Sequence, residues 1–207
     1  MLVKRLVMIL AVSACAATQH TAVSGSVAHT PADQTRADAG VQAYTQADVR
    51  FMQGMIHHHA QAVVMAGWAP TYASSEAVKI LAGRIDVGQR DEIAFMERWL
   101  RERHELHEDS MPGMNMPDTL MPGMLTPEQM QQLSSARGAE FDRLFLTFMI
   151  QHHRGALTMV DNLFSAQGAG QELYVFRFAS DVSADQTTEI DRMRTMLTAH
   201  STQPRLP

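Results

Sequence analysis

One segment of this chain occurs twice. Residues 51–66 read FMQGMIHHHAQAVVMA and residues 145–160 read FLTFMIQHHRGALTMV, so the second copy follows the first at an offset of 94 residues. At about 100° per residue, a helix places one histidine of each copy on a stripe with small residues, and the other histidine beside that stripe. The chain is therefore constrained to two related halves. Packing the two helices together would bring four imidazoles and several thioethers into one region.

A second repeat follows each copy of the first. Residues 85–100 match residues 182–197 at an offset of 97, through shared Gln, Glu, Ile, Met and Leu positions. Each half is then a pair of helices, so we predict an all-α fold, a four-helix bundle made of two repeated helix hairpins. With 207 residues, 45% of them hydrophobic, the chain is long enough to bury such a core.

Capping signals and helix breakers set the expected boundaries. Thr45 and Asp48 form a capping-box pattern at the start of the first helix, and Pro70 is expected to follow its end. The bundle domain is predicted at 45–199, with a Pro- and Gly-rich connector at 107–125 and a tail at 200–207. Helices are expected over about residues 45–67, 74–105, 126–136, 139–166 and 171–199.

The first fifteen residues resemble an export signal. Lys4 and Arg5 precede the apolar run 6–12, which is too short to span a bilayer. The tetrapeptide ending at Cys15 is similar to a bacterial lipobox, so we predict lipidation of Cys15 and a flexible tether at 16–44. The alternative is an ordinary cleaved signal. Both interpretations predict export to the periplasm or cell envelope, and a lipid anchor would be the membrane contact.

Several stretches together resemble the domain of unknown function 305 family. They lie at residues 55–66, 89–100, 121–124 and 138–156, and the doubled Met-Ile-x-His-His-x-x-Ala motif is the most specific part. The resemblance covers about residues 45–199. It implies a ferritin-like four-helix bundle of the bacterial envelope, and some members of the family bind copper. His57 stands where the family typically has Pro, and its repeat partner is Gln151, which indicates that position 57 is peripheral.

The donor atoms favour copper over other metals. Thioether sulfur suits Cu(I), and imidazole accepts both Cu(I) and Cu(II). Zinc is less well served, because Cys15 is the only cysteine and no His-Glu-x-x-His occurs. A di-iron centre is disfavoured, since no histidine has Glu three residues before it. The candidate ligands in the bundle are His58, His59, His152, His153, Met55, Met65, Met96, Met149, Met159 and Met193.

Two further sets of residues belong to the predicted site. Glu92 and Glu189 are placed to accept hydrogen bonds from the histidines. A second candidate site lies at the connector, whose methionines resemble the methionine motifs of bacterial copper-resistance proteins. The alternative for these methionines is adaptable packing across the bundle. The connector candidates are His104, His107, Met111, Met114, Met116, Met121 and Met124.

We therefore predict an exported copper-binding protein that serves copper storage, buffering or resistance. One alternative is a small oxidase or metal-dependent enzyme that uses the same histidines. Another is a metal-free bundle in which buried histidines hold the two halves in register. The formal charge of −5 and the lack of a basic face argue against nucleic-acid binding. The predicted partner is a metal ion, and the oligomeric state, a homo-oligomer included, stays open.

Overall fold

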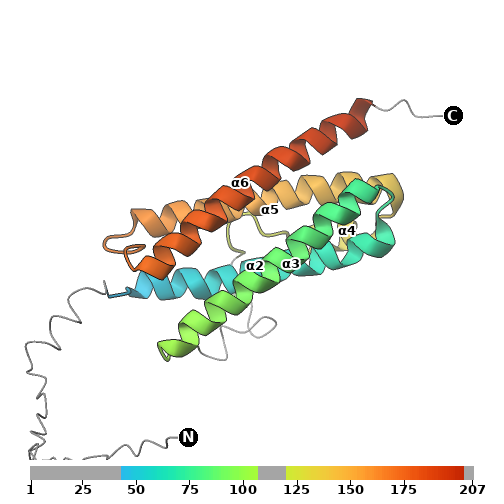
Figure 1. Cartoon of the computed structure of the whole chain (residues 1–207). Helices are drawn as coiled ribbons and strands as arrows, with labels where there is room; N and C mark the ends of the chain where they lie inside the picture. Colours follow the sequence, from blue (N-terminus) through green and yellow to red (C-terminus); the bar gives the residue numbers. More distant parts are fainter. Residues whose placement is uncertain (1–42, 107–119, 203–207) are drawn as a thin grey trace, which may run out of the picture. The chain divides into compact units, whose positions relative to one another are not determined.

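A computed structural model describes residues 43–106 and 120–202, without the side chains of the last three. In these ranges the only bridge outside the helices is an isolated one between Ala73 and Gly138, so the predicted all-α fold is confirmed. The predicted signal peptide, Cys15 and the tether through residue 42 lie outside the described residues. The helices are α2 (Gln46–Tyr72), α3 (Glu76–Glu102), α4 (Pro127–Ser135), α5 (Gly138–Ser165) and α6 (Leu173–Thr202) (Figure 1).

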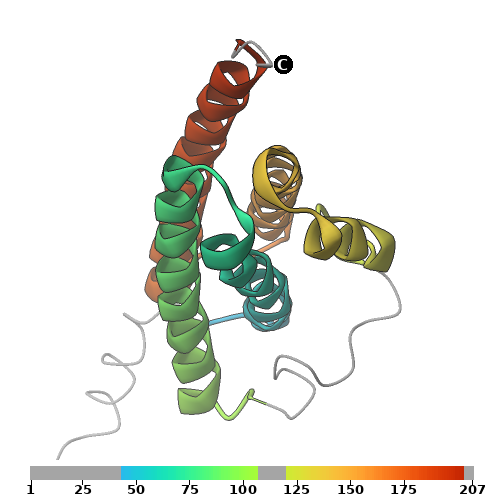
Figure 2. The ribbon, with the colours of Figure 1, turned by 90° about the vertical axis from the view of Figure 1, so that its right-hand side faces the viewer.

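The four long helices form two hairpins. α2 packs on α3 and α5 packs on α6, and the hairpins meet mainly through α2 and α5. Seen from the side in Figure 2, α3 and α6 lie next to each other as one layer, with α2 and α5 beside them. The short α4 contacts α2 and α5. This arrangement confirms the predicted bundle of paired hairpins. None of the described helices is long and apolar enough to cross a membrane.

Two predicted helix ends are wrong. α2 continues through Pro70 to Tyr72, because a proline in the last turn removes only one backbone hydrogen bond while the helix goes on burying Ala69. α3 stops at Glu102 rather than near residue 105. His104 takes a left-handed conformation with φ 57°, and the N–H of Glu105 donates to the carbonyl of Leu100, which closes the helix without glycine.

Two buried aspartates tie each hairpin to the loop of the other. Asp142 on α5 accepts hydrogen bonds from the N–H groups of Ser74 and Ser75, which join α2 to α3. Asp48 on α2 accepts from the N–H of Gly170, which joins α5 to α6, at 2.7 Å. Both side chains are fully buried. The two residues are 94 positions apart, so the contact is exchanged between the halves.

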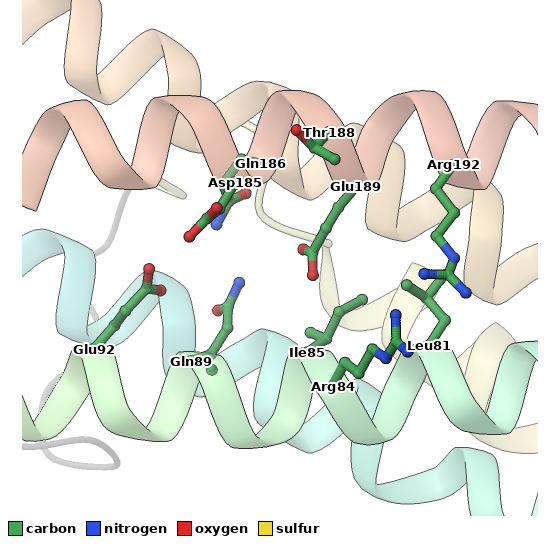
Figure 3. A pocket seen from close by; sticks show the side chains of 11 residues that line it. Leu81, Arg84, Ile85, Gln89, Glu92, Asp185, Gln186, Thr188, Glu189 and Arg192 are labelled. Atoms are coloured by element: carbon green, nitrogen blue, oxygen red, sulfur yellow. The ribbon is translucent and has the colours of Figure 1, made fainter.

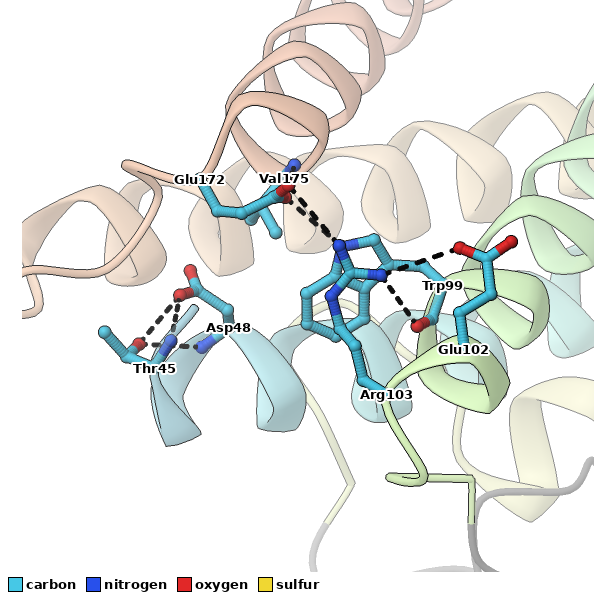
Figure 4. A network of polar contacts seen from close by, with 7 residues as sticks. All are labelled: Thr45, Asp48, Trp99, Glu102, Arg103, Glu172 and Val175. Atoms are coloured by element: carbon cyan, nitrogen blue, oxygen red, sulfur yellow. Dashed lines mark hydrogen bonds and ion pairs between the residues drawn. The ribbon is translucent and has the colours of Figure 1, made fainter. Parts of the chain in front are cut away.

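A third buried carboxylate joins the end of α3 to the start of α6. Glu172 accepts from the Trp99 indole N–H at 3.2 Å and from the Val175 N–H at 3.0 Å, and Arg103 contacts its other oxygen (Figure 4). Figure 4 also shows the predicted Thr45–Asp48 capping box at the start of α2. α3 and α6 are therefore fastened at this end.

Candidate metal centre

Four buried histidines lie together where α2 and α5 face each other. His58, His59, His152 and His153 are all 0% exposed. The rings of His58 and His152 face each other with centroids 3.8 Å apart, and each lies 6.3 Å from the ring of the histidine that follows it. The side chains that the repeat pairs in sequence are thus brought together in space.

Nε2 of each ring lies close to an oxygen acceptor. Nε2 of His58 lies 3.0 Å from the Pro122 carbonyl, and Nε2 of His152 lies 3.0 Å from the carbonyl of His58. Nε2 of His153 lies 2.6 Å from Glu189 Oε2. Nε2 of His59 lies 2.7 Å from Glu92 Oε2, an ion-pair distance without hydrogen-bond geometry. The predicted pairing of Glu92 and Glu189 with histidines therefore has a structural basis.

The second ring nitrogen, Nδ1, lacks a hydrogen-bond partner in each of the four histidines. A carbonyl oxygen only accepts, so Nε2 of His58 and of His152 carries the proton, and Nδ1 of a neutral ring then presents a lone pair. Nδ1 of all four histidines is buried and has no hydrogen-bond partner. Ligating histidines usually donate the other ring N–H to a carbonyl or a carboxylate. His58, His152 and His153 share this arrangement, and His59 approaches it through Glu92. Each buried Nδ1 is therefore a candidate donor to a metal.

Burial keeps the central rings neutral. Desolvation, followed by the neighbouring His59, lowers the pKa of His58 to about 3. Desolvation and the charges of His58, His153 and His59 lower the pKa of His152 well below its usual value. A neutral imidazole is the form that binds a metal, so these two rings do not need to lose a proton near neutral pH.

The thioethers lie in two groups along the helices. Met55 and Met96 are buried in one cluster, with Met159 packed against it. Met65, Met149 and Met193 are buried in the other. The histidines lie between Met55 and Met65 along α2. The expected single region of imidazoles and thioethers is therefore divided: the imidazoles form a central layer, and one group of thioethers lies towards each end of the helices.

The segment 121–125 covers the groove between α2 and α5. Gln61 donates to the carbonyl of Leu125 and accepts from its N–H, at 3.1 and 2.7 Å. Gly155 allows the approach, because a Cβ there would lie 2.6 Å from Gly123 Cα and closer still to the Pro122 carbonyl. The sequence signal for this contact is a single glycine within a long helix.

The connector candidates divide into three groups. Met124 is buried. A Cβ placed on Gly54 would lie 3.3 Å from the sulfur of Met121 and 3.4 Å from Cε of Met159, so both side chains reach the same place on α2. Met121 therefore comes next to a bundle thioether. His104 is exposed beyond the end of α3. The remaining candidates lie outside the described residues: His107, Met111, Met114 and Met116.

A cleft of about 260 Å³ separates the middle of α3 from the middle of α6. Figure 3 shows Glu92 and Asp185 towards one end, Glu189 in the middle, and Arg84 and Arg192 towards the other end. Burial and the charges of Glu92, Glu189 and Asp181 raise the pKa of Asp185. The carboxylates of this cleft thus repel one another. Asp185 was not among the predicted site residues.

The side chains of the histidine layer are not arranged as a complete metal-binding site. Across residues 43–106 and 120–202, no three His, Cys, Asp or Glu side chains are arranged to hold one ion. The residues nevertheless fit copper in kind, because buried neutral imidazoles and thioethers are its preferred protein donors. Binding would require side chains to turn within the layer or thioethers to complete the site.

Comparison with known families agrees with the resemblance. The family described as a domain of unknown function (DUF305) matches residues 48–197. The chain belongs to the DUF305 family. No curated protein matches this DUF305 chain.

Solved structures of DUF305 proteins share the fold. A protein from Streptomyces coelicolor predicted to be secreted is 27% identical, with a TM-score of 0.65 over 78% of this chain and 96% of its own. A fragment from Deinococcus radiodurans is 28% identical, with a TM-score of 0.63 over 75% and 98%. CopM in its Cu(II)-bound form is 28% identical, with a TM-score of 0.61 over 73% and 96%, and CopM is also known with Cu(I) bound.

Proposed function

We propose that this DUF305 protein is exported and binds copper through buried histidines and thioethers, for copper storage, buffering or resistance. The observation that carries the proposal is the set of four buried, unpartnered Nδ1 atoms. An unpaired polar atom in a protein core costs free energy, so four of them in one layer call for a partner. A metal ion supplies that partner.

The donor set favours copper within this proposal. Imidazole serves Cu(I) and Cu(II), and thioether favours Cu(I). The similarity to CopM, which has been crystallised with Cu(I), Cu(II) and silver, adds support. In this chain His58, His59, His152 and His153 would hold the ion, and Met121 and Met159 are the thioethers best placed to form a second, softer site.

Copper content tests the histidine assignment. Untagged protein is loaded with Cu(II), freed of excess metal and analysed for copper per chain. The double variant His58→Ala/His152→Ala should lose most of the bound metal while keeping a helical circular dichroism spectrum. The control His104→Ala removes an exposed histidine beyond the end of α3 and should keep the metal. Retention of copper by the first variant, with only a lower melting temperature, would mean that the buried histidines are structural.

Sulfur removal tests the thioether pair. Met121→Leu/Met159→Leu keeps the apolar volume but removes two sulfurs, so binding of Cu(I), or of Ag(I) as a redox-inert substitute, should weaken. Met124→Leu is the control, because it removes one sulfur from a buried methionine of the same segment and leaves Met121 and Met159 in place. Equal affinity in both variants would remove Met121 and Met159 from the site.

The export part of the proposal has its own test. The wild type should incorporate labelled fatty acid and partition with membranes in a Gram-negative host, and Cys15→Ser should abolish the label. An unlabelled wild type that is soluble in the periplasm would favour the ordinary cleaved signal.

A further inference from the structure

Resting on the proposed metal binding, we infer that the cleft between α3 and α6 is the route by which a metal cation reaches the buried imidazoles. Glu92, Asp185 and Glu189 would receive the ion there before the histidines bind it. The cleft would then serve only in loading the metal, and the histidines would hold it.

A route is needed because the imidazoles have no exposed surface. His59 and His153 are 0% exposed, whereas the side chains of their partners Glu92 and Glu189 are 23% and 27% exposed. Each glutamate therefore reaches from solvent in the cleft to a buried ring. The cleft is lined by both of these carboxylates. An ion in the cleft is then one side chain away from the imidazole layer.

The opposite face of the layer is closed by backbone. The Pro122 carbonyl bonds His58, and Gln61 fastens the N–H and carbonyl of Leu125. Gly155 packs so closely against Gly123 that a Cβ would not fit. A cation entering from that face would have to displace the whole segment, whereas the cleft is already open.

The charge of the cleft favours a cation at one end. Asp185 and Glu189 line it from α6 and Glu92 lines it from α3. Among the ion-pair contacts of the described residues, Glu92 and Glu189 meet only the buried histidines, and Asp185 takes part in none. Arg84 and Arg192 stand at the far end (Figure 3). The field therefore directs a cation towards the Glu92 end.

Two buried amides point to an occupant of the same space. Gln89 and Gln186 line the cleft and are 3% and 2% exposed, and the Oε1 atom of each has no hydrogen-bond partner. An amide oxygen is a further ligand for a hydrated cation. The carboxylates do not converge on one point, since no ion-holding group of three exists in the described ranges. This spacing suits passage rather than storage.

The experiment measures loading rate separately from final binding. Full-length untagged protein is mixed with Cu(II) in a stopped-flow instrument, and the phase that His58→Ala/His152→Ala lacks is followed. Gly88→Leu places a side chain in the cleft at a position with no atom within 4 Å of its Cβ, so it should fold and should slow that phase severalfold. Gly83→Leu is the matched control on α3, equally unobstructed but outside the cleft, and should load at the wild-type rate.

Charge variants give a second, milder readout. Asp185→Asn should slow loading roughly threefold and weaken its dependence on ionic strength, and Arg192→Gln should speed it. Asp161→Asn makes the same charge change on α5 away from the cleft and should have no effect. The final copper content should stay unchanged in all of these variants.

The outcomes separate the two proposals. Normal copper content with unchanged rates in Gly88→Leu and Asp185→Asn would overturn the cleft route and leave the proposed function standing. A wild type that takes up no copper in the histidine layer would overturn the proposed function, and the route with it.

Discussion

Substituting Gly155 by alanine tests whether the 121–125 segment is docked as described. In the middle of α5 this change normally stabilises a helix by about 1 kcal/mol, because glycine loses more backbone entropy than alanine. Here the new Cβ would lie 2.6 Å from Gly123 Cα and closer to the Pro122 carbonyl. Those neighbours are backbone atoms, so the segment itself has to move outwards by more than a side-chain adjustment.

The cost can be worked from the contacts that the segment makes. Moving the Pro122 carbonyl leaves the buried Nε2–H of His58 without its acceptor, which costs about 1–3 kcal/mol. Partial exposure of Met124 and Leu125, now 4% and 1% exposed, costs about 1–2 kcal/mol more. After the gain in helix propensity, we expect Gly155→Ala to lower the free energy of unfolding by about 2 kcal/mol.

Urea unfolding followed by circular dichroism measures this change. Gly67→Ala on α2 is the control, because its Cβ meets nothing within 4 Å, and it should raise stability by about 0.5–1 kcal/mol. If Gly155→Ala is as stable as Gly67→Ala, the segment does not press on α5 and the reasoning is refuted.

Three other predictions concern buried polar groups. Burial lowers the pKa of His58 to about 3 in the folded state and also lowers that of His152, so below about pH 6.5 protons favour the unfolded chain. Apo-protein should lose about 2 kcal/mol through His58 between pH 7 and 5 in urea titrations, with a further loss through His152, and a flat profile would contradict this. Asp142→Ala should cost about 2–4 kcal/mol, since it strips two loop N–H groups of their acceptor, and an unchanged melting temperature would count against that contact. Glu172→Ala should destabilise by about 2 kcal/mol and shift the emission of Trp99, whose indole N–H loses its acceptor, whereas an unaltered spectrum would show that the bond is absent in solution.

The repeat made most of the fold predictable. Two offsets of similar length imply two hairpins of similar geometry, and the doubled histidine pair implies that the imidazoles meet if the halves pack symmetrically. The pairing of Glu92 and Glu189 with histidines also followed, because equivalent carboxylates lie on the partner helix of each half. Local caps made the starts of α2, α3 and α4 predictable, since a helix cap needs only residues close in sequence.

What escaped prediction depends on contacts between distant residues. The end of α3 at His104 carries no glycine signal, because histidine takes the left-handed conformation there. The division of the thioethers into two groups follows from the antiparallel packing of α2 and α5, which pairs Met55 with Met159 and not with Met149. The closure of the layer by Pro122 depends on a segment that lies more than 60 residues from His58, as the bond to its carbonyl shows.

The exchange of Asp48 and Asp142 between the hairpins bears on how such a chain could arise. Each aspartate satisfies loop amides of the other half, so a hairpin alone would leave the N–H groups of its own turn without that acceptor. Two copies of one ancestral hairpin could meet both needs by a twofold, self-complementary association. Gene duplication and fusion would then have converted a homodimer into one chain, and the two halves could afterwards diverge, as Gly155 and its counterpart Gln61 have done on opposite sides of the same loop.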